Sequence, residues 1–298
     1  MAATERLDAV DDATVPAVRA LWGRAEEADG VGAVSEAFRM ALGAARPGVV
    51  HLLRRDGERL VGYGQVAEAG SPDAVAELVV DPAARRRGHG RALLDAALAE
   101  GTRSVWAHGD LDAARALAVA AGLDRRRELY RMTRPLTSAD AVDPVLPEGY
   151  SARSFEPGRD DEDWVALNAA AFASHPEQGR LTLADLHERM AQPWFDASGF
   201  VLVERAGRVV AFHWTKVEPG PGEGPGRVGE VYVVGVDPAE QGRGLGGPLT
   251  ALGLAHLARR GLAEGELYVA GDNTAARRTY ARLGFVDAAV DVQYAVRG

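Results

Sequence analysis

The stretch EVYVVGVDPAEQGRGLGG, residues 230–247, decides the fold that the sequence predicts. It begins as a strand of β-branched and aromatic residues, and Asp237 followed by a proline ends this strand. We expect Gly235 to mark a bulge or a close backbone approach to a ligand, because an isolated glycine inside a strand often does. The glycine-rich turn 241–247 then precedes a helix with a proline in its first turn. Backbone N–H groups and the positive helix end would converge there, which predicts a site for a pyrophosphate.

The same arrangement occurs twice in the chain. Residues 81–82 and 87–90 precede residues 237–238 and 243–246 by one constant offset. After a short insertion in the second copy, a second offset relates further pairs of segments, namely 109–110 with 271–272, 113–115 with 275–277 and 122–123 with 284–285. This internal repeat predicts two α/β domains with mixed α+β sheets, each with a parallel strand pair around a crossover helix. We expect the domains at residues 1–138 and 150–298, joined by a proline-containing linker at 139–149.

Composition excludes several classes of protein. The chain has 298 residues, 47% of them hydrophobic, and a formal net charge of -9, which argues against a general nucleic-acid binder. Cysteine is absent, so the chain has no disulfide, thiolate metal site or cysteine nucleophile, and the seven histidines show no metal-binding spacing. The N-terminus has no apolar signal segment, and no apolar run reaches the length of a membrane span. We therefore expect a metal-free, cytoplasmic, monomeric protein.

Both copies resemble the GCN5-related N-acetyltransferase (GNAT) family. Its Gln/Arg-x-x-Gly-x-Gly/Ala turn after a bulged strand binds the pyrophosphate of acetyl-CoA; residues 241–246 fit it in full, and residues 85–90 fit with arginine first. A second family motif, Asn-x-x-Ala-x-x-x-Tyr-x-x-x-Gly-Phe, is met by Asn273, Ala276, Tyr280, Gly284 and Phe285. The combination is far more specific than a glycine loop alone. The resemblance implies two tandem acetyltransferase domains that use acetyl-CoA as co-substrate.

The layout of the whole chain is similar to tandem-domain members of this family that acetylate a cysteinyl amine. Their acceptor is a cysteine–glucosamine–inositol pseudodisaccharide, and the similarity rests mainly on residues 212–216, 229–238 and 267–285. The residues themselves leave other acceptors open, such as another small amine, an antibiotic or a protein N-terminus. A non-catalytic acyl-CoA sensor is an alternative of a different class, against which Glu230 and Tyr280 argue.

The resemblance implies roles for two catalytic side chains. Glu230 would be the general base, because an α-amine with a pKa of ~7.7–8.0 must lose one proton before it attacks a thioester. Tyr280 would be the general acid for the departing thiolate. A backbone N–H freed by the bulge at 234–236 would bind the thioester oxygen as it gains charge. The alternatives are a solvated strand-end glutamate, a core tyrosine and an ordinary strand irregularity.

The resemblance also implies the residues that hold the two substrates. Predicted acetyl-CoA contacts in the second copy are Val234, Gly235, Val236, Gln241, Gly242, Arg243, Gly244, Leu245, Gly246, Gly247, Asn273, Thr274, Ala275, Ala276, Arg277 and Arg278. Those in the first copy are Leu78, Val79, Val80, Arg86, Arg87, Gly88, His89, Gly90 and Arg91. Predicted acceptor contacts are Glu36, Glu177, Lys216, Glu230 and Tyr268. Lys216 is the only lysine, yet a merely solvated role remains open for it and for most of this group.

The repeat tests whether the first copy is catalytic. The two offsets place Ala74, Val79, Leu111 and Ala118 at the positions of Glu230, Gly235, Asn273 and Tyr280. The first copy thus keeps the glycine turn and lacks the base, the acid and the bulge glycine. We expect it to bind acetyl-CoA without catalysing transfer. The alternative is that residues 85–91 form only a basic surface run.

Overall fold

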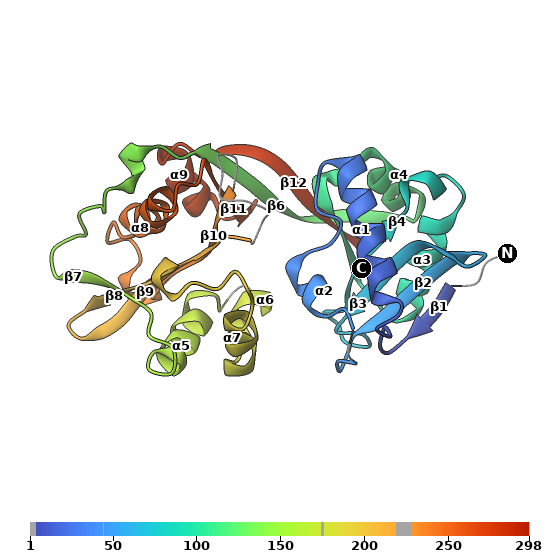
Figure 1. Cartoon of the computed structure of the whole chain (residues 1–298), viewed down its shortest axis with the longest axis horizontal. Coiled ribbons are helices and arrows are strands. Elements are labelled where there is room, and N and C mark those ends of the chain that lie inside the picture. Colours follow the sequence, from blue (N-terminus) through green and yellow to red (C-terminus); the bar gives the residue numbers. More distant parts are fainter. Residues whose placement is uncertain (1–3, 44, 174–175, 219–227, 298) are drawn as a thin grey trace. The chain divides into compact units, whose positions relative to one another are not determined.

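The computed structural model describes residues 4–43, 45–173, 176–218 and 228–297 (Figure 1). The chain forms two compact units, Met1–Leu129 with Ala289–Gly298, and Tyr130–Ala288. Two long strands, β6 (Leu123–Pro135) and β12 (Val286–Val296), each contribute residues to both units. The repeat-based division at residues 138 and 150 therefore does not coincide with the edges of the compact units. It assigned each of these strands whole to one domain.

The first unit is a mixed sheet with helices on both faces (Figure 1). Its strands are β1 (Thr4–Leu7), β2 (Val50–Asp56), β3 (Arg59–Ala67), β4 (Val75–Val80) and β5 (Ser104–Ala107), in the order β1-β2-β3-β4-β5-β12. Its helices are α1 (Val15–Asp29), α2 (Glu36–Met40), α3 (His89–Ala99), α4 (Asp112–Ala120) and the 3-10 turns η1 (Pro82–Ala84) and η2 (His108–Asp110). Strands β4 and β5 run parallel, and α3 is the crossover between them. The other paired neighbours run antiparallel.

The second unit repeats this plan (Figure 1). Its strands are β7 (Tyr150–Ser154), β8 (Phe200–Arg205), β9 (Arg208–Lys216), β10 (Val228–Val236) and β11 (Glu264–Ala270), in the order β6-β11-β10-β9-β8-β7. Its helices are α5 (Asp161–Ala171), α6 (Pro176–Gly179), α7 (Leu183–Met190), α8 (Gly246–Arg259), α9 (Thr274–Arg282) and the 3-10 turns η3 (Ser138–Ala141), η4 (Ala197–Gly199) and η5 (Pro238–Glu240). Strands β10 and β11 are its parallel pair, joined by α8. The predicted fold class, two mixed α/β domains in tandem, is confirmed.

Each sheet buries two apolar faces. In the first unit, α1 packs on Leu53, Tyr63 and Val79, whereas α3 packs on the opposite face. In the second unit, α5 and α7 cover an aromatic core built from Phe155, Trp164, Trp194, Phe200, Phe212 and Trp214. Helices α8 and α9 cover the other face, together with Tyr130 and Met132 of β6. Within the described ranges, no helix is long and apolar enough to cross a membrane.

The expected linker is part of the second unit. Its 3-10 turn η3 lies against α8, and the Arg259 guanidinium donates to the Ala141 carbonyl and pairs with Asp143 at 2.7 Å. The backbone N–H of Leu136 also donates to the Ala263 carbonyl at 2.8 Å. The segment therefore packs on the second unit instead of only connecting two domains.

Candidate active site

Strand β10 carries one extra residue after its first two pairs with β9. Glu230 lies opposite Lys216 and Val231 opposite Thr215, but the next pair is Val233 with Trp214. Tyr232 is therefore the bulged residue. The bulge expected at residues 234–236 is wrong in position by a few residues.

Gly235 has a different reason to be glycine. It pairs in regular register with Phe212 of β9. A Cβ added at Gly235 would lie 2.3 Å from Cε1 of the Phe212 ring, well inside any tolerable contact. The glycine therefore makes room for a core aromatic side chain, a requirement that the sequence of β10 alone cannot reveal.

The bulge coincides with the place where two parallel strands part. Strands β10 and β11 pair from Val228 opposite Glu264 to Val231 opposite Leu267. The next residue of β10 is the bulged Tyr232, and the next of β11 is Tyr268, whose side chain is 43% exposed. Among the described residues the register of β10 with β11 ends here, and a strand edge that is open in this way can pair with an amide-bearing ligand.

The glycine turn after β10 has the geometry of an anion site. Gly242 and Gly244 have φ values of +78° and +80°, which a residue with a side chain rarely adopts. The Gln241 amide donates to the Val236 carbonyl at 3.3 Å and anchors the turn to the strand end. Helix α8 starts at Gly246, so the N–H groups of its first turn lie directly after the turn. The turn that the sequence predicts is thus present and leads into a helix start.

The second family motif builds helix α9. Asn273 is its N-cap residue, and its side-chain oxygen accepts from the Ala276 N–H at 3.1 Å. The Arg277 guanidinium lies 3.9 Å from the centroid of the Tyr130 ring and pairs with Asp287 at 2.8 Å. These contacts give Asn273 and Arg277 structural partners in addition to the acetyl-CoA contact predicted for them.

Tyr280 lies on α9 and is partly buried against the core of the second unit. Its ring packs edge to face on Phe285 with the centroids 5.9 Å apart, in the cluster that includes Leu254 and Leu267. Burial raises the pKa of Tyr280 to about 12. The hydroxyl therefore keeps its proton throughout the neutral pH range and can act as a hydrogen-bond donor.

Glu230 and Lys216 occupy directly opposed positions on β10 and β9. Directly opposed residues of an antiparallel pair project on the same face, with Cβ atoms about 4.5–5.5 Å apart. Lys216 is only 7% exposed, and its Nζ lies 2.7 Å from a Glu218 carboxylate oxygen. The structure thus brings two of the predicted acceptor residues together beside the split.

For the other predicted acceptor residues, the structure gives the element on which each one lies. Tyr268 lies on β11 just past the last paired residue. Glu36 is the first residue of α2 in the first unit. Glu177 belongs to α6, but its side chain lies outside the described part of the chain. Within the described residues, no group of three or more His, Asp or Glu side chains is placed to hold a metal ion.

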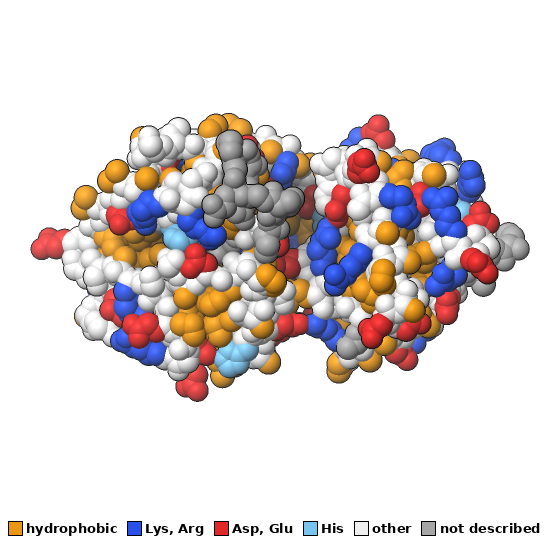
Figure 2. Space-filling view, in the orientation of Figure 1, with side chains coloured by type: hydrophobic (Ala, Val, Ile, Leu, Met, Phe, Trp, Pro, Cys, Tyr) orange, Lys and Arg blue, Asp and Glu red, His pale blue; other side chains and the backbone are white. Residues whose placement is uncertain are grey.

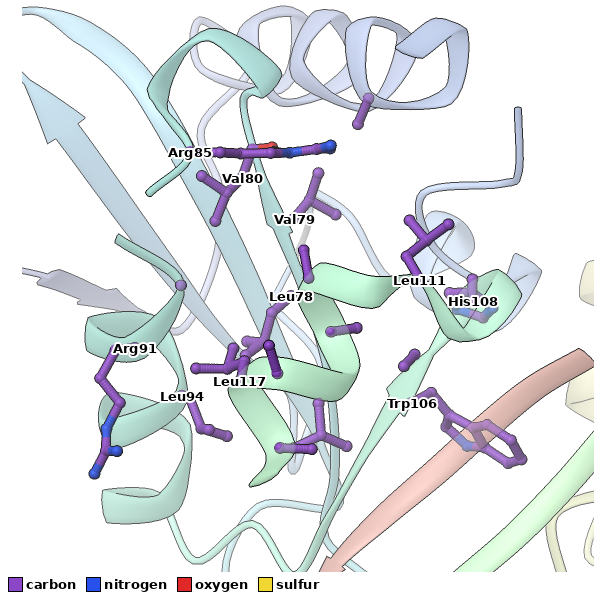
Figure 3. Close-up of a pocket in the computed structure, with 18 of the residues that line it drawn as sticks. Leu78, Val79, Val80, Arg85, Arg91, Leu94, Trp106, His108, Leu111 and Leu117 are labelled. Atoms are coloured by element: carbon purple, nitrogen blue, oxygen red, sulfur yellow. Dashed lines mark hydrogen bonds between the residues drawn. The ribbon is translucent and has the colours of Figure 1, made fainter. Parts of the chain in front are cut away.

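The first unit contains a pocket of about 570 Å³ in the split between β4 and β5 (Figure 3). Every acetyl-CoA contact predicted for the first copy except Arg87 lines this pocket. Leu78 of β4 and Leu117 of α4 line it, as do Trp106 within β5 and His108 directly after that strand. Arginine side chains are numerous on the face of this unit seen in Figure 2, so it is the pocket and not charge that marks the site.

Two groups at this pocket were not predicted from the sequence. Arg85 forms a two-pronged ion pair with Asp29 of α1 at 2.6 and 2.7 Å, and its Nε donates to the Val80 carbonyl at 3.2 Å. That last bond matches the one between Gln241 and Val236, so the first position of the turn motif could have predicted it.

The second group centres on His108. Its ring lies 2.9 Å from Asp291 of β12 and 3.3 Å from Glu77 of β4. Burial opposes the charged ring, but the two carboxylates outweigh it and raise the pKa of His108 to about 10. No sequence signal joins residues so far apart in the chain.

Strand register also corrects one correspondence between the copies. Val75 of β4 pairs with Ser104 of β5, and Glu230 pairs with Glu266 of β11. Ser104 and Glu266 match in the repeat, so Val75 and not Ala74 occupies the position of Glu230. The inserted Tyr232 causes the shift of one residue. The conclusion that the first copy lacks the glutamate is unchanged.

Comparisons with known proteins agree with this geometry. The model of the acetyltransferase (GNAT) family matches residues 164–285, and a model of the acetyltransferase (GNAT) domain matches residues 47–131. A mycothiol acetyltransferase of Streptomyces avermitilis is 50% identical over 97% of this chain and 94% of its own length. One from Thermobispora bispora is 53% identical over 93% of this chain and 94% of its own length.

A solved structure shares the fold of the whole chain. It is a GCN5-related N-acetyltransferase from Sphaerobacter thermophilus, which matches with a TM-score of 0.71 over 98% of this chain and 94% of that one. The two sequences are 23% identical, so this match speaks to the fold alone. The sequence relatives go further, because their similarity extends over both units. The chain belongs to the mycothiol acetyltransferases, which carry two domains of the GNAT acetyltransferase family.

Proposed function

We propose that this enzyme transfers the acetyl group of acetyl-CoA to the cysteinyl amine of 1D-myo-inositol 2-(L-cysteinylamino)-2-deoxy-glucopyranoside, the last step of mycothiol biosynthesis. The relatives that are about 50% identical over both units support this acceptor. The observation that carries the reaction type is the bulge at Tyr232, which places Glu230 at the point where β10 and β11 part. Along the chain, the Glu230 carboxylate is then followed by the part of β10 that no longer pairs with β11 and by the start of α8 at Gly246.

The acetyl donor fits the second unit. The turn at Gly242 and Gly244 and the start of α8 supply N–H groups for its pyrophosphate. The strand groups of residues 234–236 would pair with the amides of its pantetheine arm. A backbone N–H at the bulge would bind the thioester oxygen as negative charge develops on it.

In the proposed mechanism, two side chains handle the protons. Glu230 takes the proton that makes the acceptor ammonium unreactive, and the free amine nitrogen bonds to the thioester carbon as the C–S bond breaks. Tyr280 donates a hydrogen bond to the departing sulfur. Because its pKa of about 12 exceeds that of a thiol, ~8.5, Tyr280 keeps its own proton. The nitrogen loses its second proton as the amide forms, and this proton neutralises the CoA thiolate. No covalent enzyme intermediate is needed.

The first unit has a different role in this proposal. Its pocket of about 570 Å³ supports binding of acetyl-CoA or CoA. Val75 and Ala118 stand where the second unit has its carboxylate and its tyrosine, so neither of these two positions carries a side chain that can exchange protons with an amine. We propose that this unit binds acetyl-CoA or CoA without catalysing transfer.

That the enzyme acts as a cytoplasmic monomer stays a prediction. Cell fractionation would test its localisation, and sedimentation would test its oligomeric state.

Purified full-length enzyme tests the proposed function. The pseudodisaccharide, a simple amino sugar, an aminoglycoside and a peptide with a free N-terminus are each mixed with acetyl-CoA. Release of the CoA thiol and the mass of the acceptor are followed. We expect the pseudodisaccharide to gain one acetyl group on nitrogen with the highest kcat/KM. Faster acetylation of another amine would overturn the acceptor, and binding of acetyl-CoA with no transfer to any amine would favour the sensor.

The Glu230→Gln variant tests the proton transfer in the same assay. We expect turnover to fall by roughly 10²–10⁴, the usual share of a general base, with the KM for acetyl-CoA little changed. The matched control is Glu266→Gln, since Glu266 lies at the same register on the neighbouring strand and pairs with Arg131 at 3.2 Å. Unchanged turnover of Glu230→Gln between pH 6 and 9 would remove Glu230 from the mechanism.

A further inference from the structure

The bulged residue itself has contacts that its position alone does not require. The Tyr232 hydroxyl accepts from the Arg189 Nε of α7 at 3.1 Å. Its ring packs edge to face on Trp194 and Trp214, with centroids 5.0 and 5.3 Å away. Tyr232 is thus tethered at its tip and held on two sides.

This tethered ring lies next to Lys216. The Lys216 Nζ is 5.2 Å from the centroid of the Trp194 ring and 5.5 Å from that of Tyr232. Both rings are within the range in which an aromatic face attracts an ammonium. Trp194 is 5% exposed and Lys216 is 7% exposed, whereas the Glu218 partner is 66% exposed at its side chain. The Lys216 ammonium thus lies in a cage of two aromatic rings, and its carboxylate partner Glu218 is exposed to solvent.

The cage fixes Lys216 opposite Glu230. Because the two residues are directly opposed across β9 and β10, their side chains share a face at short range. An aminoacyl amide presents an amine and a carbonyl oxygen on adjacent carbon atoms. A carboxylate and an ammonium held side by side match those two groups, one by accepting from the amine and one by donating to the carbonyl oxygen.

We propose that Tyr232 is a positioning residue for acceptor recognition. Together with Trp194 and Arg189 it holds the Lys216 ammonium beside Glu230, and this pair selects α-aminoacyl amides over amines that lack the neighbouring carbonyl. The inference rests on the proposed function, because it names the feature of the acceptor that the same site reads. The inserted residue then has two effects: it opens the strand split, and it builds one wall of the acceptor site.

The test compares two small acceptors that differ only in this feature. Cysteinamide carries the amine, the thiol and the carbonyl, whereas cysteamine lacks the carboxamide. Each is measured as an acceptor and as a competitor of the pseudodisaccharide in the full-length enzyme. We expect cysteinamide to be preferred about tenfold or more by the wild type, in kcat/KM or in inhibition constant. Equal preference, or competition by neither compound, would overturn the inference while leaving acetylation of the pseudodisaccharide intact.

The variants then separate positioning from folding. Tyr232→Phe keeps the ring and loses the hydroxyl that binds Arg189, and Tyr232→Leu removes the wall of the cage. We expect the preference for cysteinamide over cysteamine to fall about threefold and tenfold, respectively, with the KM for acetyl-CoA little changed. An equal loss on both acceptors would reduce Tyr232 to a structural residue.

A matched control comes from the same unit. Tyr150 also has a hydroxyl bond, to Glu240 at 2.6 Å, and a cation over its ring, Arg205 at 5.2 Å. Tyr150→Leu should leave the ratio between the two acceptors unchanged. A shift in that ratio as large as the one produced by Tyr232→Leu would contradict the assignment. Failure of the wild type to acetylate the pseudodisaccharide would instead contradict the proposed function.

Discussion

Strands β4 and β10 hold the same place in the two units, yet they differ by one inserted residue. Strand β4 pairs with β3 residue for residue from Val75 to Val80. Strand β10 has the same neighbours and the same turn after it, but Tyr232 interrupts its register. In the first unit the parallel pairing continues to Glu77 opposite Trp106, one position past the point where it ends in the second. The single inserted residue in β10 thus makes the parallel pairing end at Val231, directly after Glu230.

The cores behind these strands differ as well. In the second unit, Phe200 stacks on Trp214 with centroids 4.4 Å apart, and a third ring, Phe212, lies beside them. The corresponding positions in the first unit hold three polar side chains, His51, Gln65 and Tyr63.

These three side chains form a buried chain of hydrogen bonds. The Tyr63 hydroxyl lies 2.7 Å from His51 Nδ1 and donates to Gln65 at 2.8 Å. Burial and the nearby Glu77 raise the pKa of Tyr63, so its proton is retained. The aromatic stack lies on the face that carries Lys216 and Tyr232 in the second unit. The comparison teaches that the first unit differs on the acceptor side of its sheet and not only in its catalytic residues.

The largest effect that would sharpen this comparison concerns tyrosine. Tyr280→Phe should lower turnover by roughly 10²-fold, because it removes the donor to the departing sulfur. The matched control is Tyr63→Phe in the first unit, a buried tyrosine whose hydroxyl bonds to His51 and Gln65. Steady-state kinetics with acetyl-CoA and the pseudodisaccharide measure both. Since the pKa of Tyr280 is about 12, the wild-type rate should show no loss from its deprotonation below about pH 10. Equal effects of the two variants would remove Tyr280 from the proposed mechanism.

The next effect separates the two units by pH. The pKa of His108 rises from 6.5 to about 10, so its stabilising contribution is complete below pH 6.5 and is lost as pH rises through 10. Burial lowers the pKa of His213 to about 4, so its contribution is complete above pH 6.5 and is lost as pH falls toward 4. The first unit should therefore lose stability in alkali and the second in acid, each by roughly a few kcal/mol.

Thermal unfolding of two variants across pH 4–10 checks this prediction. His108→Gln should flatten the alkaline limb, and His213→Gln should flatten the acid limb. The wild type supplies the reference at each pH. If the two variants changed the same limb, the contrast between the units would be wrong.

A smaller effect concerns the glycine on β10. Gly235→Val copies the first unit, where Val79 stands opposite Tyr63. Because a Cβ at Gly235 would meet the Phe212 ring at 2.3 Å, the variant should lower the free energy of unfolding by about 1–3 kcal/mol. Urea unfolding measures this change. The double variant Gly235→Val with Phe212→Leu should recover part of the loss, and no recovery would contradict the packing explanation.

The smallest effect lies in the two glycine turns. Arg86 holds a φ of +64° in the first turn, where the second has Gly242 with a φ of +78°. Gly242→Ala should cost about 1 kcal/mol of unfolding free energy, because a side chain is strained in this region. Arg86→Gly should change stability by less than about 0.5 kcal/mol, because relief of strain is offset by the greater freedom of glycine in the unfolded chain. Chemical denaturation measures the free energy of unfolding of both variants. Equal losses for Gly242→Ala and Arg86→Gly would contradict this explanation from backbone strain.

Much of the fold could be predicted from the sequence, because its signals are local. The repeat, the glycine turns and the helix that follows Asn273 depend on neighbours within a few residues. The position of the bulge could not be predicted, because the need for Gly235 comes from Phe212 on another strand. That β6 and β12 contribute to both units could not be predicted either, since the pattern of polar and apolar residues in a strand does not show which sheet it joins. The His108 site depends on Asp291, near the other end of the chain.

We propose that both units keep the phosphate turn and that only the second supports chemistry. Gly88 and Gly244 are matched positions for a test, with φ values of +84° and +80° and no atom within 4 Å of an added Cβ. An aspartate at either position would repel a pyrophosphate at similar cost in strain. The measurement is turnover of acetyl-CoA with the pseudodisaccharide for Gly88→Asp and Gly244→Asp in the full chain. We expect Gly244→Asp to lose at least about 100-fold in kcat/KM for acetyl-CoA and Gly88→Asp to stay within about threefold of wild type. A loss as large in Gly88→Asp would contradict the account.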